Sequence, residues 1–198
     1  MSAIRTINNV EYPVAGTWTA VPGHSELDFI VRHMGLSKVR GRFSRINVVA
    51  GITEDLVSST LDVTIDMASI QTGEPDRDKH LQSNDFFDVQ EYPVARFRSQ
   101  GIDLSGRKAT AEGELTIREV TRPVTLNIEY LGHGVAPDLH SSVRTFFTAS
   151  ATINREDWAL TWNRLLETGG LLISKEVRLE VEVELELELG RPINDWSL

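Results

Sequence analysis

The sequence predicts an antiparallel all-β fold, and three observations carry this prediction. Residues 176–189 alternate strictly between apolar and charged side chains. Further strand-like segments follow one another at spacings of roughly 10 to 15 residues. Turn residues, and not long helices, separate them. A barrel and a sandwich both satisfy this pattern, and a closed barrel has the advantage that it leaves no long strand edge exposed to aggregation.

The clearest strand is Glu176–Leu189, in which valine and leucine alternate with arginine and glutamate. Successive side chains of a strand point to opposite faces, so one face is apolar and the other acidic. At about 3.3 Å per residue the strand is roughly 40 Å long, enough for one strand of a large curved sheet or barrel. A helix is the alternative, since Glu and Leu favour helices, but a period of two would scatter the leucines around it.

The other extended segments show weaker forms of the same alternation. In Ser25–His33, for example, Leu27, Phe29, Val31 and His33 share one face. About nine segments are predicted as strands: 17–21, 25–33, 42–52, 59–70, 94–103, 109–118, 123–131, 145–154 and 176–189. Turns are predicted from glycine, proline and serine at Gly101, Ser105–Gly106, Gly132–Pro137 and Gly169–Gly170.

Two stretches depart from the strand pattern. Residues 75–84 are predicted as a short helix, because Pro75 suits a first helical turn and acidic residues precede the apolar Leu81. Residues 157–166 are expected to form a second, irregular excursion. The predicted fold class is therefore all-β with one or two short helices.

Length and composition indicate a folded domain with a sizeable core. The 198 residues are 40% hydrophobic and 25% charged, which is typical of a globular protein and fits one large β domain. Residues 1–15 lack a sustained period and are expected to form an arm that is loose or docks late. The barrel is placed at residues 16–190 and a C-terminal tail at residues 191–198.

Charge and residue usage exclude several classes of function. The net charge of −9 disfavours a nucleic-acid partner, whose phosphates are neutralised by Lys and Arg. The absence of cysteine excludes disulfides and thiolate chemistry. The chain shows neither a signal peptide nor a membrane span, so a cytoplasmic protein without stable membrane insertion is expected, with a periplasmic one as the alternative if a leader was removed.

Catalytic signatures are absent from the sequence. The histidines have no metal-ligand spacing of the His-x-x-x-His kind, and there is no nucleophile elbow, phosphate loop or dinucleotide fingerprint. We therefore expect a non-catalytic protein with no cofactor. The alternative left open is an enzyme or metal protein that uses His24, His33 and nearby carboxylates inside the barrel.

The apolar strand faces point to a binding cavity. The apolar interior of a closed barrel is either filled by side chains or leaves room for an apolar ligand. Phe86 and Phe87 are predicted to cap the barrel mouth, and Trp158 and Trp162 are predicted to cover an opening. The candidate lining residues are Phe29, Val31, Val63, Ile65, Met67, Phe97, Leu115, Ile117, Leu126, Ile128, Phe147, Leu179, Val181 and Val183, although each is also a typical core residue.

An ordered set of short motifs resembles one known family. The segments that carry it are His24–His33, Val39–Phe43, Arg77–Val89, Gly113–Val124 and Ile173–Val177. Together they are similar to the YceI-like family of polyisoprenoid-binding, lipocalin-like proteins, over about residues 16 to 189. The resemblance implies an extended, about eight-stranded lipocalin-like barrel. It also implies a long internal tunnel that holds an isoprenoid chain or a comparable amphiphile such as a quinone tail.

The same resemblance implies candidate partners for the ligand head group. Matching the family motif position by position nominates His24, His33, Arg77 and His80. An equally weighted alternative is that Arg77 and His80 only tie the helix to the sheet. Many relatives are exported and linked to acid or base stress, whereas no leader is seen in this sequence. A third alternative is a filled barrel that serves as a scaffolding module or a homodimer.

Overall fold

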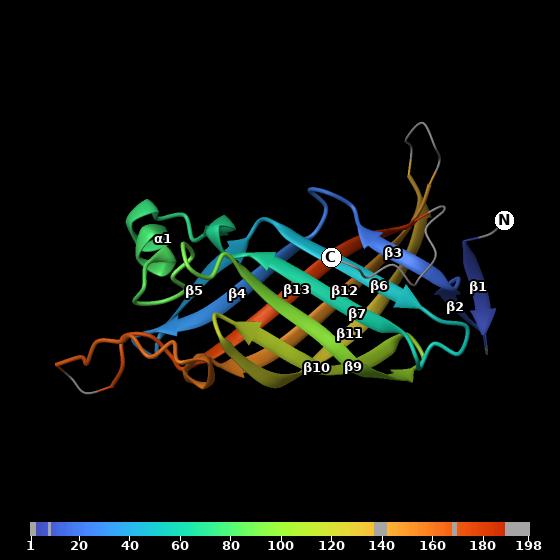
Figure 1. The fold of residues 1–198 in the computed structure, drawn as a ribbon. Helices are drawn as coiled ribbons and strands as arrows, with labels where there is room; N and C mark the ends of the chain where they lie inside the picture. Colours follow the sequence, from blue (N-terminus) through green and yellow to red (C-terminus); the bar gives the residue numbers. More distant parts are fainter. Residues whose placement is uncertain (1–2, 8, 137–141, 168–169, 189–198) are drawn as a thin grey trace.

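The chain folds into an elongated antiparallel β-barrel, shown by a computed structural model that describes residues 3–7, 9–136, 142–167 and 170–188 (Figure 1). Its principal strands are β3 (Gly16–Ala20), β6 (Ile46–Ile52), β7 (Thr60–Asp66), β9 (Val94–Ser105), β10 (Lys108–Ile117), β11 (Val120–Val135), β12 (Val143–Asn154) and β13 (Glu176–Leu187). The sheet runs β12-β11-β10-β9-β7-β6-β3-β13, and β13 pairs back with β12. This closes an eight-stranded barrel and confirms the predicted fold class.

Three strand positions are built from two pieces each, which lengthens the barrel at one end. β4 (Glu26–His33) continues β3, so β13 pairs with β3 and β4 in succession. β5 (Ser37–Phe43) pairs with β4 and leads into β6. β8 (Ile70–Gln71) follows β7 after the 3₁₀ turn η1 (Met67–Ser69), and it pairs with β5. The predicted single strand 59–70 is therefore interrupted, because the carboxylate of Asp66 accepts the N–H of Ala68 at 2.9 Å and starts the turn.

β13 confirms the prediction made from its alternation. Val183 and Leu185 are buried, with 9% and 3% of their surface exposed. Basic side chains of neighbouring strands pair with the acidic face, among them Arg144 of β12, whose Nη1 lies 2.8 Å from a carboxylate oxygen of Glu186. Cross-strand pairs of opposite charge stabilise such a face, which like charges alone would destabilise. Leu189, the last residue of the predicted strand, lies outside the described residues.

Two predicted turns are wrong, because long strands pass through them. β9 continues past Gly101, where the register with β10 shifts by one residue. β11 continues past Gly132 to Val135 with a similar shift opposite β12. A glycine inside a strand marks a bulge as readily as a turn, and a bulge bends a strand without ending it. The predicted turn at Ser105–Gly106 is confirmed between β9 and β10.

Short helices lie at the end of the barrel that β4 and β5 extend (Figure 1). The predicted helix is present as α1 (Pro75–Gln82), which begins with proline as expected. The second excursion begins with the 3₁₀ helix η2 (Arg155–Trp158) and continues as irregular backbone. None of the described helices has the length and apolar character needed to cross a membrane.

A hairpin at the N-terminus was missed by the sequence analysis. β1 (Ile4–Ile7) and β2 (Val10–Pro13) pair with each other and lie at the opposite end from α1 (Figure 1). Arg5 donates to the carbonyl of Thr53 at 2.6 Å and pairs with Glu54, and the Tyr12 hydroxyl donates to the carbonyl of Gly106 at 2.8 Å. Side chains of the hairpin thus hold it to the barrel, and no apolar period was available to predict it. The C-terminal tail, residues 191–198, lies outside the described residues.

Aromatic rings inside the barrel lie against glycines of neighbouring strands. A Cβ added to Gly41 would come within 2.3 Å of the Phe29 ring, and one added to Gly113 within 2.5 Å of the Phe97 ring. The missing side chain lets each ring lie flat on the barrel wall, which is the pairing known as aromatic rescue of glycine. These two positions therefore set how much of the interior the rings occupy.

Gly113→Ala is expected to destabilise the fold by about 1–3 kcal/mol, because the new methyl group overpacks the site. It would lie 2.4 Å from the backbone oxygen of Arg98 as well as against Phe97. The matched control is Gly101→Ala on the adjacent strand, where nothing lies within 4 Å, and a change within about 0.5 kcal/mol is expected. Urea unfolding of the two variants measures both values, and equal losses would contradict the packing argument.

Asp55 supports the loop between β6 and β7 on which the hairpin docks. Its carboxylate accepts the Thr53 hydroxyl at 2.7 Å, the Ser58 N–H at 3.0 Å and the Ser58 hydroxyl at 2.7 Å. These hydrogen bonds favour the charged form and lower the pKa of Asp55 from 3.8 to about 2.

Because the folded-state pKa of Asp55 lies below its unfolded value, its contribution to stability is present above about pH 4 and is lost as the pH falls toward 2. Ser58→Ala removes the hydroxyl donor and keeps the backbone N–H, so it is expected to raise this pKa part of the way toward 3.8. Titration of the Asp55 carboxyl carbon by NMR measures the pKa in both proteins. An unchanged pKa in the variant would show that the Ser58 hydroxyl does not stabilise the carboxylate.

Candidate functional site

A large apolar cavity lies inside the barrel at the α1 end. Its volume is about 480 Å³, within the range of roughly 300–1,000 Å³ that is typical of ligand pockets. Apolar side chains of β4, β5, β7, β10 and β13 form the wall. Of the sequence-predicted site residues, Phe29, Val31, His33, Ile65, Met67, Arg77, His80, Phe86, Phe87, Leu115, Ile117 and Leu179 line it.

An aromatic cluster closes part of this end of the barrel. The ring of His80 lies 4.6 Å from that of Trp162 and 5.2 Å from that of Phe86, both edge to face. Phe87 contacts Phe43 with ring centroids 5.8 Å apart. The structure therefore places Phe86, Phe87 and Trp162 in the lining of the cavity. A cap over the barrel mouth was predicted at the two phenylalanines, and a cover over an opening at the tryptophan. Trp158 lies instead in the core, where its indole N–H donates to the carbonyl of Leu115 at 3.0 Å.

The polar groups at this end first hold α1 in place. Arg77 donates to the hydroxyl and carbonyl of Thr72 at 2.7 and 2.8 Å, and Asp78 accepts the N–H of Thr72 at 2.8 Å. His80 Nε2 lies 2.9 Å from a carboxylate oxygen of Asp85. The Arg77 contacts fit the alternative in which this residue ties the helix to the sheet, whereas His80 bonds to the loop that follows α1; both residues also border the cavity.

His24 does not join the other three nominated head-group residues. Its side chain is 61% exposed and its Nδ1 lies 3.0 Å from Glu184 on the acidic face of β13. His33, in contrast, lines the large cavity. It is the last residue of β4 and forms an isolated antiparallel β-bridge with Ile173. No group of three or more His, Asp or Glu side chains suited to a metal ion occurs among the described residues. The two histidines of the metal alternative are therefore not brought together.

A second apolar cavity lies toward the N-terminal hairpin. Its volume is about 150 Å³, and Tyr12 and Pro13 of the hairpin border it. Val63, Leu126, Ile128, Phe147, Val181 and Val183, all predicted from the sequence, line this cavity and not the larger one. The candidate lining residues therefore divide into two sets along the barrel axis.

Phe97 lies between the two cavities. Along β9, Ala95 lines the large cavity and Ile102 the small one, with Phe97 on the inward face between them. At this level Phe97 is paired with Leu115 on β10, which lines the large cavity, and with Val63 on β7, which lines the small one. The structure thus has two cavities where the family resemblance implied one long tunnel, and the buried Phe97 lies at the level between them.

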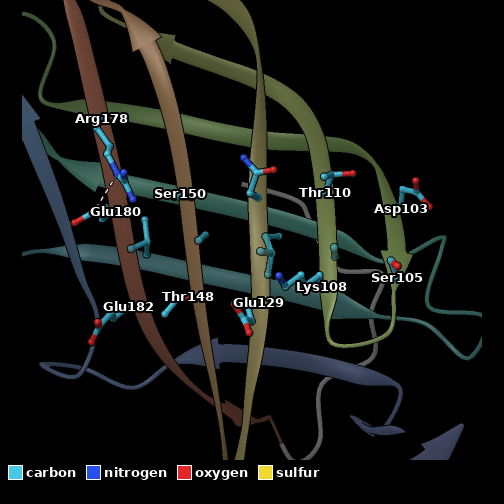
Figure 2. A pocket seen from close by; sticks show the side chains of 15 residues that line it. Asp103, Ser105, Lys108, Thr110, Glu129, Thr148, Ser150, Arg178, Glu180 and Glu182 are labelled. Carbon is cyan, nitrogen blue, oxygen red and sulfur yellow. Dashed lines mark ion pairs between the residues drawn. The ribbon is translucent and has the colours of Figure 1, made fainter. Parts of the chain in front are cut away.

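The outer wall of the barrel carries a further concave surface of different chemistry. Figure 2 shows polar side chains from β9 to β13, including Lys108, Glu129 and Glu182, on this surface. Acidic groups outnumber basic ones there, and Arg178 pairs with Glu180 at 2.8 Å. An open, charged surface does not remove an apolar ligand from water, so the interior cavity is the candidate site.

Arg155 is the charged residue deepest in the fold among the cavity residues that were not predicted from the sequence. It begins η2, borders the large cavity and is only 4% exposed. A lone arginine after a strand gives no pattern that predicts burial, since arginine is rarely buried.

Fold and cavity together define a small β-barrel protein with an apolar interior, and comparison with known proteins identifies the family. A sequence model of the YceI-like domain matches residues 18–185. The chain belongs to the YceI-like family, which confirms the resemblance stated above. It is similar to UPF0312 proteins of Staphylococcus epidermidis and Staphylococcus aureus, each 35% identical over 158 residues that cover 79% of this chain and 90% of the relative.

Solved structures share the barrel. A YceI protein of Campylobacter jejuni is 27% identical with a TM-score of 0.67, covering 80% of this chain and 90% of its own. BcnA of Burkholderia cenocepacia is 20% identical with a TM-score of 0.71, covering 83% and 98%. A polyisoprenoid-binding domain of Saccharophagus degradans is 17% identical with a TM-score of 0.59, covering 86% and 98%. The last two likenesses concern the fold alone.

Proposed function

We propose that the protein is a non-catalytic binding protein that holds a long isoprenoid or a similar amphiphile, such as a quinone tail, inside the barrel. The observation that carries this proposal is the large apolar cavity at the α1 end, bordered by only a few polar side chains. Membership of the YceI-like family and the fold shared with a polyisoprenoid-binding domain support it.

The physical basis of binding is the removal of an apolar chain from water. Each Å² of apolar surface that is buried contributes about 25 cal/mol, so a tail that buries about 300 Å² gains roughly 7 kcal/mol. Lost translational and chain freedom offsets part of this gain. The cavity wall offers an apolar tail no directional bond, so specificity rests on length and shape.

Length selection is proposed to depend on Phe97. Phe97 lies at the level between the two cavities, so a chain that extends from the large cavity into the small one is expected to displace its ring. The wild-type interior therefore suits a tail that ends at Phe97 or displaces its ring.

Protein purified without detergent is expected to carry a lipid. Native mass spectrometry should show a mass above that of the polypeptide, and extraction with organic solvent should release an amphiphile with a long apolar chain. Protein delipidated in this way should take up added prenols. A clean apo mass together with no uptake of long prenols would rule out the proposed function, and stoichiometric metal in elemental analysis would favour the enzyme alternative.

Phe97→Ala is expected to join the two cavities and to shift selectivity toward longer chains. The ratio of the dissociation constants for farnesol and solanesol should move in favour of solanesol by about tenfold or more, since each additional buried methylene contributes about 0.8 kcal/mol. Tryptophan fluorescence titration gives both constants.

The matched control is Phe29→Ala, which removes the same ring volume from the wall of the large cavity and leaves the division at Phe97 in place. Both variants are expected to lose roughly 3–5 kcal/mol of stability. Thermal unfolding checks that the two losses are similar. A shift toward solanesol of equal size in both variants would refute the role of Phe97 in length selection.

A further inference from the structure

Arg155 occupies an unusual place for a charged residue. Among the described residues that are fully buried, it is the one with an ionic side chain, and it borders the large apolar cavity. It stands at the junction where β12 ends and η2 begins. Arginine stays protonated at neutral pH, so its position brings a positive charge to the interior of the barrel.

Only part of the guanidinium is used to hold the fold together. Nε donates to the carbonyl of Ser174 at 3.0 Å, and Nη1 donates to the carbonyl of Leu160. These bonds join the η2 turn to the segment that leads into β13. Nη2 is buried and has no hydrogen-bond partner in the part of the chain that the structure describes. The guanidinium of Arg155 has five N–H donors, and the two on Nη2 therefore remain available to a ligand.

Arg155 also forms no ion pair with the described residues, although the charge of Glu156 acts on it from a distance. Its neighbour Glu156 pairs instead with Lys175 at 2.8 Å. Burial lowers the pKa of Arg155 below its ordinary value, through the loss of hydration of the charged form. A buried charge without a partner is costly, so buried charges in proteins are paired as a rule.

We propose that the missing partner is the anionic head group of the bound amphiphile, whose carboxylate or phosphate oxygen accepts a hydrogen bond from Nη2 of Arg155. The head group then lies inside the barrel, and the tail occupies the rest of the large cavity. This inference rests on the proposed function and narrows it to amphiphiles with an anionic oxygen in the head group.

The position of Arg77 makes it the weaker site for such a head group. Its guanidinium is committed to Thr72 through Nε and Nη2, and the residue is exposed to water on α1. An exposed ion pair contributes little, whereas a hydrogen bond between charged groups in a buried site contributes substantially more. His33, which also borders the cavity, lies beside Ile173, next to the Ser174 carbonyl that holds Arg155.

The test compares three ligands that share one tail: geranylgeraniol, geranylgeranoic acid and geranylgeranyl diphosphate. The delipidated wild-type protein is expected to bind at least one anionic ligand about tenfold or more tightly than the alcohol, which is the order of a hydrogen bond to a charged group. The carboxylate and diphosphate arms show which anion the site takes. Arg155→Met, which keeps an apolar chain of similar length, is expected to reduce this preference to about twofold or less.

Arg77→Met is the matched control and is expected to retain the full preference for the anionic ligand. A second measurement needs no variant at Arg155: in the ¹⁵N-labelled wild-type protein, the guanidinium resonances of Arg155 should shift with the anionic ligand and not with the alcohol. If Arg155→Met fails to fold, this NMR measurement tests the inference by itself.

The remaining outcomes separate two failures. Equal affinity for the alcohol and both anions, unshifted Arg155 resonances, or a preference that is lost in Arg77→Met and kept in Arg155→Met would overturn the inference and leave the proposed function standing. No binding of any of the three ligands, and no uptake of longer prenols, would overturn both.

Discussion

The structure depends on the closure of the sheet by β13. This strand pairs with β12 along one edge and with β3 and β4 along the other, so it completes the barrel. Because both edges of β13 are paired, each of its side chains points either into the barrel interior or out to the solvent. The alternation of Glu180, Val181 and Glu182 meets this requirement, and a slip by one residue would place carboxylates in the interior. Closure and alternation together create a space walled by apolar side chains.

The candidate site follows from the way this space is filled. Small residues at Gly41 and Gly113 let large rings lie against the wall, and the interior stays partly hollow. The extension of the barrel by β4, β5 and β8 enlarges the hollow at one end, where α1 and the aromatic cluster around His80 and Trp162 cover it. The interior is thus a graded space, wide beneath α1 and narrower beyond Phe97.

Much of the fold was predictable because its signals are local. Strict alternation predicted β13, and Pro75 with its acidic neighbours predicted α1. The sequence predicts turns at Gly101 and Gly132 where the structure has bulges, since glycine gives the same local signal for both and only the pairing of distant strands decides between them. The N-terminal hairpin was missed for a related reason, as side-chain bonds from Arg5 and Tyr12 to distant loops hold it to the barrel.

The candidate site was predictable in kind and less so in detail. Inward apolar residues such as Met67 and Val183 follow from the period of two, yet their division between two cavities depends on barrel geometry. His24 was grouped with the cavity residues by motif, and the structure places it beside Glu184 outside. The burial of Arg155 depends on backbone carbonyls brought to it by the segment 160–174, which no sequence period encodes.

The position of β13 has a consequence for biosynthesis. Leu187 pairs with Trp18, so the contact that closes the barrel joins residues from nearly opposite ends of the described chain. Such long-range pairings form late, because the entropy of closing a large loop must be overcome first. Until β13 has been synthesised and docked, the apolar faces of the other strands enclose nothing and stay open to water or to chaperones. A closed interior is therefore expected to exist only after nearly the whole barrel has been translated, so the proposed ligand would bind after folding and not during it.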